Sequence, residues 1–237
     1  MSAAGARCEQ CAIRHQAICG ALNDAELRRL SEIARQRQVK AGEPIVSAED
    51  EATSFANIVS GVVKLSKILP DGRQQIVGLQ FAPDFLGRPY RKRAPFFAEA
   101  ASDVQLCVFP RAGFERLLGE IHDLETRLFQ DTLDELDAAR DWMLLLGRKT
   151  AAEKVATFLS LVARRNAMIG CAHTPALAKQ TIILPLTRAE IADYLGLTIE
   201  TVSRQLGRLK SQGVLAVGSN RAITVLDPEA LEAAAEG

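Results

Sequence analysis

The chain has 237 residues, of which 48% are hydrophobic and 24% charged, so it has the composition of an ordinary globular protein large enough for two domains. Its 29 basic and 29 acidic residues balance, and no apolar run approaches the roughly 20 residues of a membrane span. These features argue against a membrane protein or a secreted one with a signal peptide, and we expect a cytoplasmic location where thiols stay reduced.

Three of the five cysteines, Cys8, Cys11 and Cys19, fall within twelve residues of an otherwise polar segment, residues 1–22. Together with a fourth, distant thiolate they could hold an iron–sulfur cluster. Four thiolates suit zinc equally well, although Cys-x2-Cys-x7-Cys is not a paired zinc pattern. A thiol redox switch and incidental cysteines remain open. We expect His15 to be a solvated loop residue and Cys171 to be a free thiol.

Residues 23–118 predict a small β-rich domain. An amphipathic helix is expected over Asn23–Arg35, followed by short apolar runs from Val39 to Phe109. The turn at Pro70-Asp71-Gly72 separates two of these runs, because proline presets φ and glycine permits positive φ. Short strands at regular spacing indicate an antiparallel β-sandwich or β-roll.

Residues 119–147 predict a long helix over Asp123–Leu146 with a heptad-like apolar seam. Its members recur at alternating steps of three and four residues: Phe129, Thr132, Leu136, Ala139, Met143 and Leu146. Eight acidic and two basic residues between 119 and 141 are consistent with an exposed helix. The seam therefore indicates either a dimer helix or a helix packed on its own core.

Residues 148–237 predict a helix over Ala151–Arg165, a connector over Gly170–Gln180, and then a helix-turn-helix. Thr187 and Glu190 form a capping box that starts one short helix, and Gly196 ends it. Thr198 then caps a second helix that runs to about Ser211. The run GVLAVGSNRAITV that follows predicts a β-hairpin wing, with Arg221 near a phosphate. We also expect the two capping residues, Thr187 and Thr198, to lie near DNA.

The second of these helices has the chemistry of a DNA-recognition helix. Glu200, Ser203 and Arg204 share one face near its N-terminus, with Gly207 and Arg208 further along it. Arginine can bond guanine O6 and N7 together, and glutamate can accept from cytosine N4. Eleven basic and four acidic residues between 147 and 221 are compatible with a polyanionic partner. A solvated amphipathic helix is the alternative interpretation.

The stretch LTRAEIADYLGLTIETVSRQLGRLKSQGVL resembles the DNA-binding motif of the CRP/FNR superfamily of bacterial transcription regulators. Glu200-x-x-Ser203-Arg204 is similar to the FNR-type recognition helix, and DELDAARDWMLLLGRKTAAEKVATFL is similar to the FNR dimer helix and the segment after it. The resemblance covers nearly the whole chain. It implies an α+β fold with a cyclic-nucleotide-binding-like β-roll sensor domain, a dimerisation helix and a winged helix-turn-helix.

The resemblance further implies an oxygen-responsive activator with a [4Fe-4S] cluster held by Cys8, Cys11, Cys19 and Cys107. The last gap between the N-terminal cysteines is two residues longer than in enterobacterial members. The implied partners are a second copy of the chain, palindromic DNA with half-sites like TTGAT and ATCAA, and RNA polymerase with its housekeeping sigma factor. By resemblance, the loop at Asp71, Gly72 and Arg73 would contact that sigma factor.

Two classes of function are not expected. The relatives that bind cyclic AMP carry an Arg-Ser or Arg-Thr pair after a Gly-Glu segment, whereas this chain has Phe85-Leu86-Gly87-Arg88-Pro89 and then RKRAPFFAEA. Cyclic-nucleotide binding is therefore not expected, and we expect Arg88–Arg93 to be a solvated loop. An enzyme is not expected either, since the sequence shows no Gly-rich phosphate loop and its three histidines are scattered. A zinc-stabilised or constitutive DNA-binding regulator remains the alternative.

Overall fold

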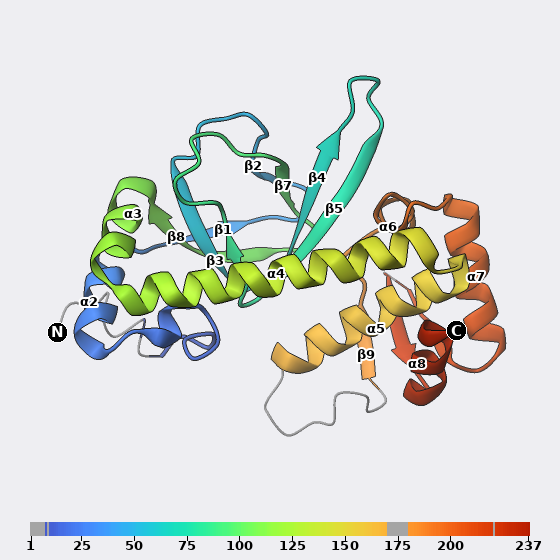
Figure 1. The fold of residues 1–237 in the computed structure, drawn as a ribbon. Helices are drawn as coiled ribbons and strands as arrows, with labels where there is room; N and C mark the ends of the chain where they lie inside the picture. The colour runs from blue at the N-terminus through green and yellow to red at the C-terminus, as the bar shows by residue number, and fades with distance from the viewer. Residues whose placement is uncertain (1–7, 9, 170–179, 220) are drawn as a thin grey trace. The chain divides into compact units, whose positions relative to one another are not determined.

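The computed structural model describes residues 8, 10–169, 180–219 and 221–237. It divides into two compact units, one of residues 1–73 and 77–139 and the other of residues 74–76 and 140–237. Figure 1 shows mixed helix and strand content in the chain, which confirms the expected α+β class. In the described part of the chain, no helix is long and apolar enough to cross a membrane.

The first unit begins with the 3-10 helix η1 (Ile18–Ala21) and the helix α2 (Asp24–Ile33). The Asn23 side chain accepts hydrogen bonds from the backbone N–H groups of Ala25 and Glu26, and the Glu26 carboxylate accepts one from the N–H of Asn23. This capping box fixes the helix start. The helix ends two residues before the predicted Arg35, because Arg35 pairs with Val108 and begins the first strand.

Eight strands form two four-stranded sheets, as the predicted roll requires. The first sheet has the order β1-β8-β3-β6, with bounds Arg35–Val39, Val104–Pro110, Ser54–Ser60 and Phe85–Leu86. The second has the order β2-β7-β4-β5, with bounds Pro44–Val46, Phe97–Ala100, Val62–Ile68 and Gln74–Phe81. Strand structure begins four residues before the predicted Val39.

Strands β3 and β8 bury side chains on both faces. Ala56 and Ile58 of β3 and Leu106 of β8 belong to the core inside the roll. Alternate residues of the same strands, including Phe55 and Phe109, pack outside it with α2, with α3 (Arg111–Glu120) and with the beginning of α4 (His122–Arg148). The strand alternation therefore generates two apolar clusters. We did not predict α3 from the sequence.

The second unit contains the C-terminal part of α4, the helix α5 (Ala151–Ile169) and the winged helix-turn-helix. Helix α5 continues four residues beyond the predicted Arg165. Trp142 of α4 stacks on Tyr194 with ring centroids 3.9 Å apart, and Phe158 of α5 meets the same ring edge-on. These aromatic contacts join the end of α4 and α5 to the DNA-binding motif.

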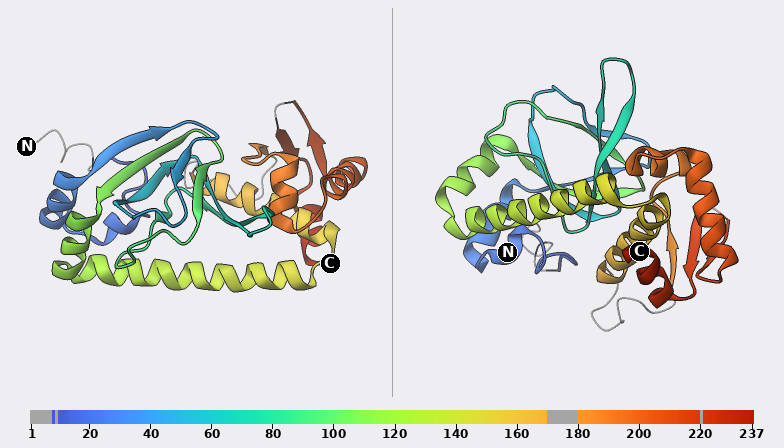
Figure 2. Two further views of the ribbon diagram at one scale, coloured as in Figure 1. Left: turned by 90° about the horizontal axis from the view of Figure 1, so that it is seen from above. Right: turned by 45° about the vertical axis from the view of Figure 1, so that its right-hand side comes forward.

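The motif itself consists of α6 (Arg188–Leu195) and α7 (Ile199–Ser211), followed by the wing strands β10 (Leu215–Val217) and β11 (Ala222–Val225). A strand that the sequence analysis missed, β9 (Gln180–Ile183), pairs antiparallel with β11 and completes a three-stranded sheet (Figure 2). Helix α8 (Pro228–Glu236), also unpredicted, packs on α5. The expected wing is therefore confirmed as part of a larger sheet.

Candidate metal centre and nucleic-acid interface

The N-terminal cysteines lie in a compact series of turns that leads into η1. The backbone N–H of Arg14 donates to the Cys11 carbonyl at 3.1 Å, and the N–H of Gly20 donates to the Ala17 carbonyl at 2.8 Å. A Cβ atom at Gly20 would lie 2.8 Å from the His15 carbonyl oxygen. Since that approach is too short for a side chain, glycine allows the turn to close beside Cys19. No signal in the sequence indicated this role for Gly20.

The four cysteines implied by the resemblance are all half-buried. Cys8, Cys19 and Cys107 pack against the apolar cluster formed with α2, α3 and α4, and Cys11 and Cys19 contact the core of the roll. Burial raises the pKa of the Cys19 thiol to about 11, and the neighbouring Cys11 and Cys8 act in the same direction. Any metal bound there must therefore displace a proton from Cys19.

Cys107 lies in β8 between two amide-bearing neighbours, since it pairs with Gln36 of β1 and Asn57 of β3. Directly paired residues of an antiparallel sheet present their side chains on the same face. Asn57 is only 1% exposed, and its Oδ1 has no hydrogen-bond partner among the described residues. A buried amide therefore lies beside the fourth thiol. This neighbour could be identified only from the pairing of β3 with β8, because the two residues are far apart in the sequence.

In residues 8, 10–169, 180–219 and 221–237, no three His, Cys, Asp or Glu side chains are arranged to hold a metal ion. Assembly of a metal centre therefore requires the thiol side chains to turn toward one another. His15 is exposed, as expected of a solvated loop residue. Cys171 lies outside the described residues, so the expectation that it is a free thiol stays a prediction.

The helix-turn-helix begins and ends where the sequence signals indicated. The Thr187 hydroxyl accepts from the N–H of Glu190 at 3.2 Å, and the Glu190 carboxylate accepts from the N–H of Thr187 at 2.8 Å. Gly196 ends α6 in the left-handed conformation with φ of 63°. The Thr198 hydroxyl accepts from the N–H of Thr201 at 3.2 Å and caps α7. Local hydrogen bonds and a left-handed glycine therefore set the ends of the two helices.

One face of α7 is buried and the other is open to solvent. Val202, Leu206 and Leu209 are all less than 7% exposed. On the opposite side Glu200, Arg204, Gly207 and Arg208 are exposed, and Ser203 is half-buried. Hydrogen bonds from its own backbone N–H and from the Thr198 hydroxyl hold the pKa of Glu200 below its usual value. This carboxylate is therefore ionised and can accept from a base edge.

Three further positions were expected near DNA: Thr187 before α6, Thr198 before α7 and Arg221 in the wing. All three are exposed. Arg221 has φ of 65° and donates through Nη1 to the Pro185 carbonyl at 3.1 Å. One end of its guanidinium thus holds the segment before α6. A phosphate contact by Arg221 stays a prediction.

The predicted seam of α4 is open to solvent along most of its length. Phe129 is 62% exposed, Leu136 44% and Met143 68%. Thr132 and Ala139 are also exposed, and Leu146 is half-buried. Leu133 and Leu144, which the heptad pattern did not include, add to the exposed apolar surface. An apolar helix face of this kind marks an interaction surface rather than a helix packed on its own core.

The loop of the β4–β5 hairpin presents Asp71, Gly72 and Arg73 at its tip. The Arg73 guanidinium donates through Nε to the Asp71 carboxylate at 2.8 Å and keeps the pKa of that carboxyl below its usual value. Both side chains are more than half exposed. The loop is therefore accessible, while its contact with polymerase stays a prediction.

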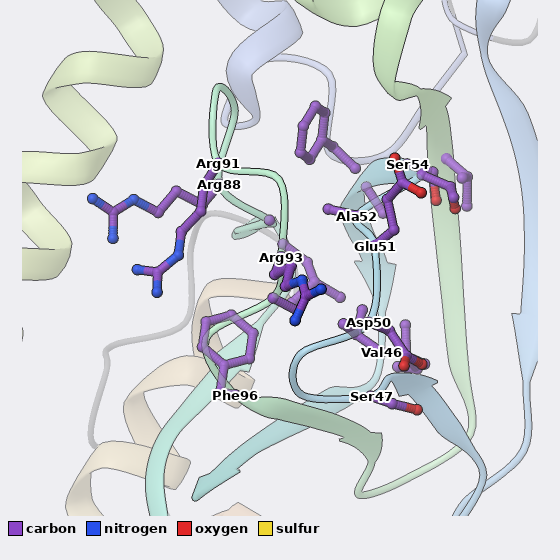
Figure 3. Close-up of a pocket in the computed structure, with 18 of the residues that line it drawn as sticks. Val46, Ser47, Asp50, Glu51, Ala52, Ser54, Arg88, Arg91, Arg93 and Phe96 are labelled. Atoms are coloured by element: carbon purple, nitrogen blue, oxygen red, sulfur yellow. The ribbon is translucent and has the colours of Figure 1, made fainter.

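The sensor domain contains a cavity of about 270 Å³ between the two sheets. Its wall includes Asp50, Arg93 and Phe96, and also Arg88 and Arg91, whose side chains point away from the other labelled residues in Figure 3. All three arginines are exposed, as expected of a solvated loop, but they line this cavity as well. The expectation that cyclic nucleotides do not bind stays a prediction.

Two domain families match the chain. The Crp-like helix-turn-helix domain matches residues 153–234, and the cyclic nucleotide-binding domain matches residues 36–120. A probable transcriptional activator of Rhizobium leguminosarum bv. viciae is 49% identical over 95% of this chain and 91% of its own length. These matches cover both units.

Two further relatives have more specific names. The transcriptional activator protein FnrL of Cereibacter sphaeroides is 44% identical over 93% of this chain and 88% of its own. The nitrogen fixation regulation protein FixK of Bradyrhizobium diazoefficiens is 43% identical over 96% and 93%. Among solved structures, FixK2 from Bradyrhizobium japonicum superposes with a TM-score of 0.74, 35% identity and coverage of 85% of this chain and 96% of that one.

Proposed function

Because the chain belongs to the CRP/FNR family of transcription regulators, whose members act as dimers, we propose that it is an oxygen-responsive activator with a [4Fe-4S] cluster. Its relatives are DNA-binding transcription regulators and not enzymes, and this chain is one as well. The proposal adds the sensor, the palindromic site and the polymerase contact. In this proposal Cys8, Cys11, Cys19 and Cys107 hold the cluster.

The observation that carries the proposal is that four thiols, three from the N-terminal turns and one from β8, pack against the two apolar clusters of the sensor domain. A donor set made only of thiols, with apolar side chains around it, fits an iron–sulfur cluster. Such a cluster, when bound, supplies an oxygen-labile link among the four thiolates. Dimerisation and DNA binding depend on other residues of the chain.

Those residues connect the thiols to DNA in two steps. With the N-terminal turns held against β8, the first turns of α4 pack on the same apolar cluster, and the exposed seam is available to a second copy of the chain. Dimerisation then presents two α7 helices to two half-sites of a palindrome. Two tethered readers bind far more tightly than one, since the second contact is intramolecular.

The test is purification without air, followed by visible absorption and by iron and sulfide analysis. Wild-type protein should contain iron and sulfide in equal amounts, and Cys107→Ala should lose both along with binding to a palindromic site. Cys171→Ala is the matched control and should retain them. Tight binding to that site by Cys107→Ala would show that Cys107 is not a ligand.

The alternative is a zinc-stabilised or constitutive regulator, which the all-thiol donor set also accommodates. It predicts stoichiometric zinc without labile sulfide, and DNA binding that is the same with and without air. That result would refute the oxygen-sensing proposal while leaving the family assignment intact.

A further inference from the structure

One side chain of α4 reaches directly into the cysteine-bearing turns. The Arg127 guanidinium donates through Nη2 to the carbonyl of Gln16 at 2.6 Å, although the two residues are 111 positions apart. Gln16 lies between Cys11 and Cys19, and its backbone N–H donates to the Ile13 carbonyl to close a turn. A main-chain carbonyl of the proposed cluster segment is therefore bonded to the long helix.

The same guanidinium is fixed from its other side. Its Nε donates to the Asp131 carboxylate at 2.8 Å, one helical turn further along α4. Both side chains are only about one-third exposed. Because a guanidinium is a rigid planar fork, two acceptors held at once determine its orientation. Arg127 thus ties the turn at Gln16 to a defined position on α4.

Charge makes this contact sensitive to loss. Burial raises the pKa of the Asp131 carboxyl, Arg127 opposes that rise, and the carboxylates of Asp134 and Asp84 add to it. Arg127 therefore supplies positive charge that offsets these three carboxylates. If the Gln16 carbonyl moves away, the guanidinium loses one of the two acceptors that fix it.

Arg127 lies on the opposite face of α4 from the seam, so it can hold the helix without blocking the dimer contact. At 3.6 residues per turn, Phe129 and Leu136 lie about 200° and 180° around the helix from Arg127. Arg127 therefore holds α4 from the face opposite the seam. Leu124 and Leu128 pack beside it on the apolar cluster that also contacts Cys8, Cys19 and Cys107.

We propose that Arg127 is the positioning residue through which the cysteine-bearing turns set the orientation of α4 and so of its seam. This inference rests on the proposed function, since it specifies how the state of the thiols reaches the dimer interface. With the turns in place, Arg127 aligns the first turns of α4 for pairing. With the turns displaced, that alignment is lost, even though all four cysteines are still present.

The test compares Arg127→Gln, Arg127→Lys and the control Arg116→Gln, which removes the same charge from an exposed position on α3. For each, iron and sulfide are measured without air, and the dimer dissociation constant is measured by sedimentation for loaded and metal-free protein. In Arg127→Gln, loaded chains should dimerise about tenfold more weakly than in the wild type, within the usual range of coupling between sites. Arg127→Lys should be intermediate, and Arg116→Gln should match the wild type.

Two results would overturn the inference. One is loaded Arg127→Gln that dimerises as tightly as the loaded wild type, whether or not less cluster is retained. The other comes from hydrogen exchange of metal-free protein, which needs no cluster. Amides between residues 122 and 136 should exchange faster in Arg127→Gln than in Arg116→Gln, and equal rates would show that Arg127 does not position α4. A wild type whose dimerisation ignores the cluster would instead contradict the proposed function.

Discussion

The sharpest prediction of the sensor geometry concerns Gly20, where any side chain meets backbone. A Cβ atom there would lie 2.8 Å from the His15 carbonyl oxygen and 2.9 Å from that of Arg14. Ordinary contact begins near 3.4 Å, so the turn must open by about half an ångström. Both clashing atoms belong to the main chain between Cys11 and Cys19. We expect Gly20→Ala to cost about 1–3 kcal/mol of unfolding free energy, the usual cost of overpacking.

The assay is urea denaturation of metal-free protein followed by circular dichroism, together with anaerobic visible absorption of loaded protein. Gly119→Ala is the matched control, because it lies in α3 and has nothing within 4 Å of its Cβ position. That substitution should stabilise by about 0.5–1 kcal/mol through the unfolded state. Gly20→Ala should also retain less cluster. Equal unfolding midpoints for Gly20→Ala and the wild type would refute the packing argument.

Three further predictions concern the other elements. Arg204→Ala should weaken binding to the palindrome by about 1–3 kcal/mol and relax preference at one base pair in a binding titration; equal loss on random DNA would contradict base readout. Leu136→Glu should leave the monomer folded, since that side chain is 44% exposed, yet abolish the dimer in sedimentation. Burial raises the pKa of Tyr194 in the folded protein. The contribution of the neutral phenol to the free energy of unfolding is therefore present below the pKa of an unfolded tyrosine, about 10, and is lost as pH rises beyond that value. In Tyr90→Phe, which leaves Tyr194 as the sole tyrosine, phenolate absorbance should appear only with unfolding; its appearance near pH 10 in folded protein would be the contrary result.

The helix-turn-helix was predictable because its signals are local. Thr187 bonds Glu190 three residues away, Gly196 supplies the left-handed end of α6, and Thr198 caps α7 within three residues. Each of these contacts joins residues that are close in the sequence, so a short stretch of sequence is enough to predict it. The seam of α4 was predictable for the same reason, although its exposed set also includes Leu133 and Leu144, where exposure and an ideal heptad differ.

The contacts that organise the sensor were not predictable in this way. Arg127 meets Gln16 across 111 residues, and Asn57 meets Cys107 only because β3 pairs with β8 in that register. Strand β9 was missed because its hydrogen bonds go to β11, which follows about 40 residues later. No periodicity within a short window encodes contacts of this kind. They follow from the fold once the strands have paired.

Asn57 in the sensor and Arg221 in the wing both depart from the usual rules of stable folding. Asn57 buries an amide oxygen that has no partner among the described residues, an arrangement that costs about 1–3 kcal/mol. Arg221 adopts φ of 65°, which is unfavourable for a residue with a side chain. The first lies beside the fourth thiol of the proposed cluster, and the second fixes the segment before α6. Folding alone would favour an apolar residue at the first position and a glycine at the second, so the proposed cluster and the predicted phosphate contact each supply a reason for the residue found there.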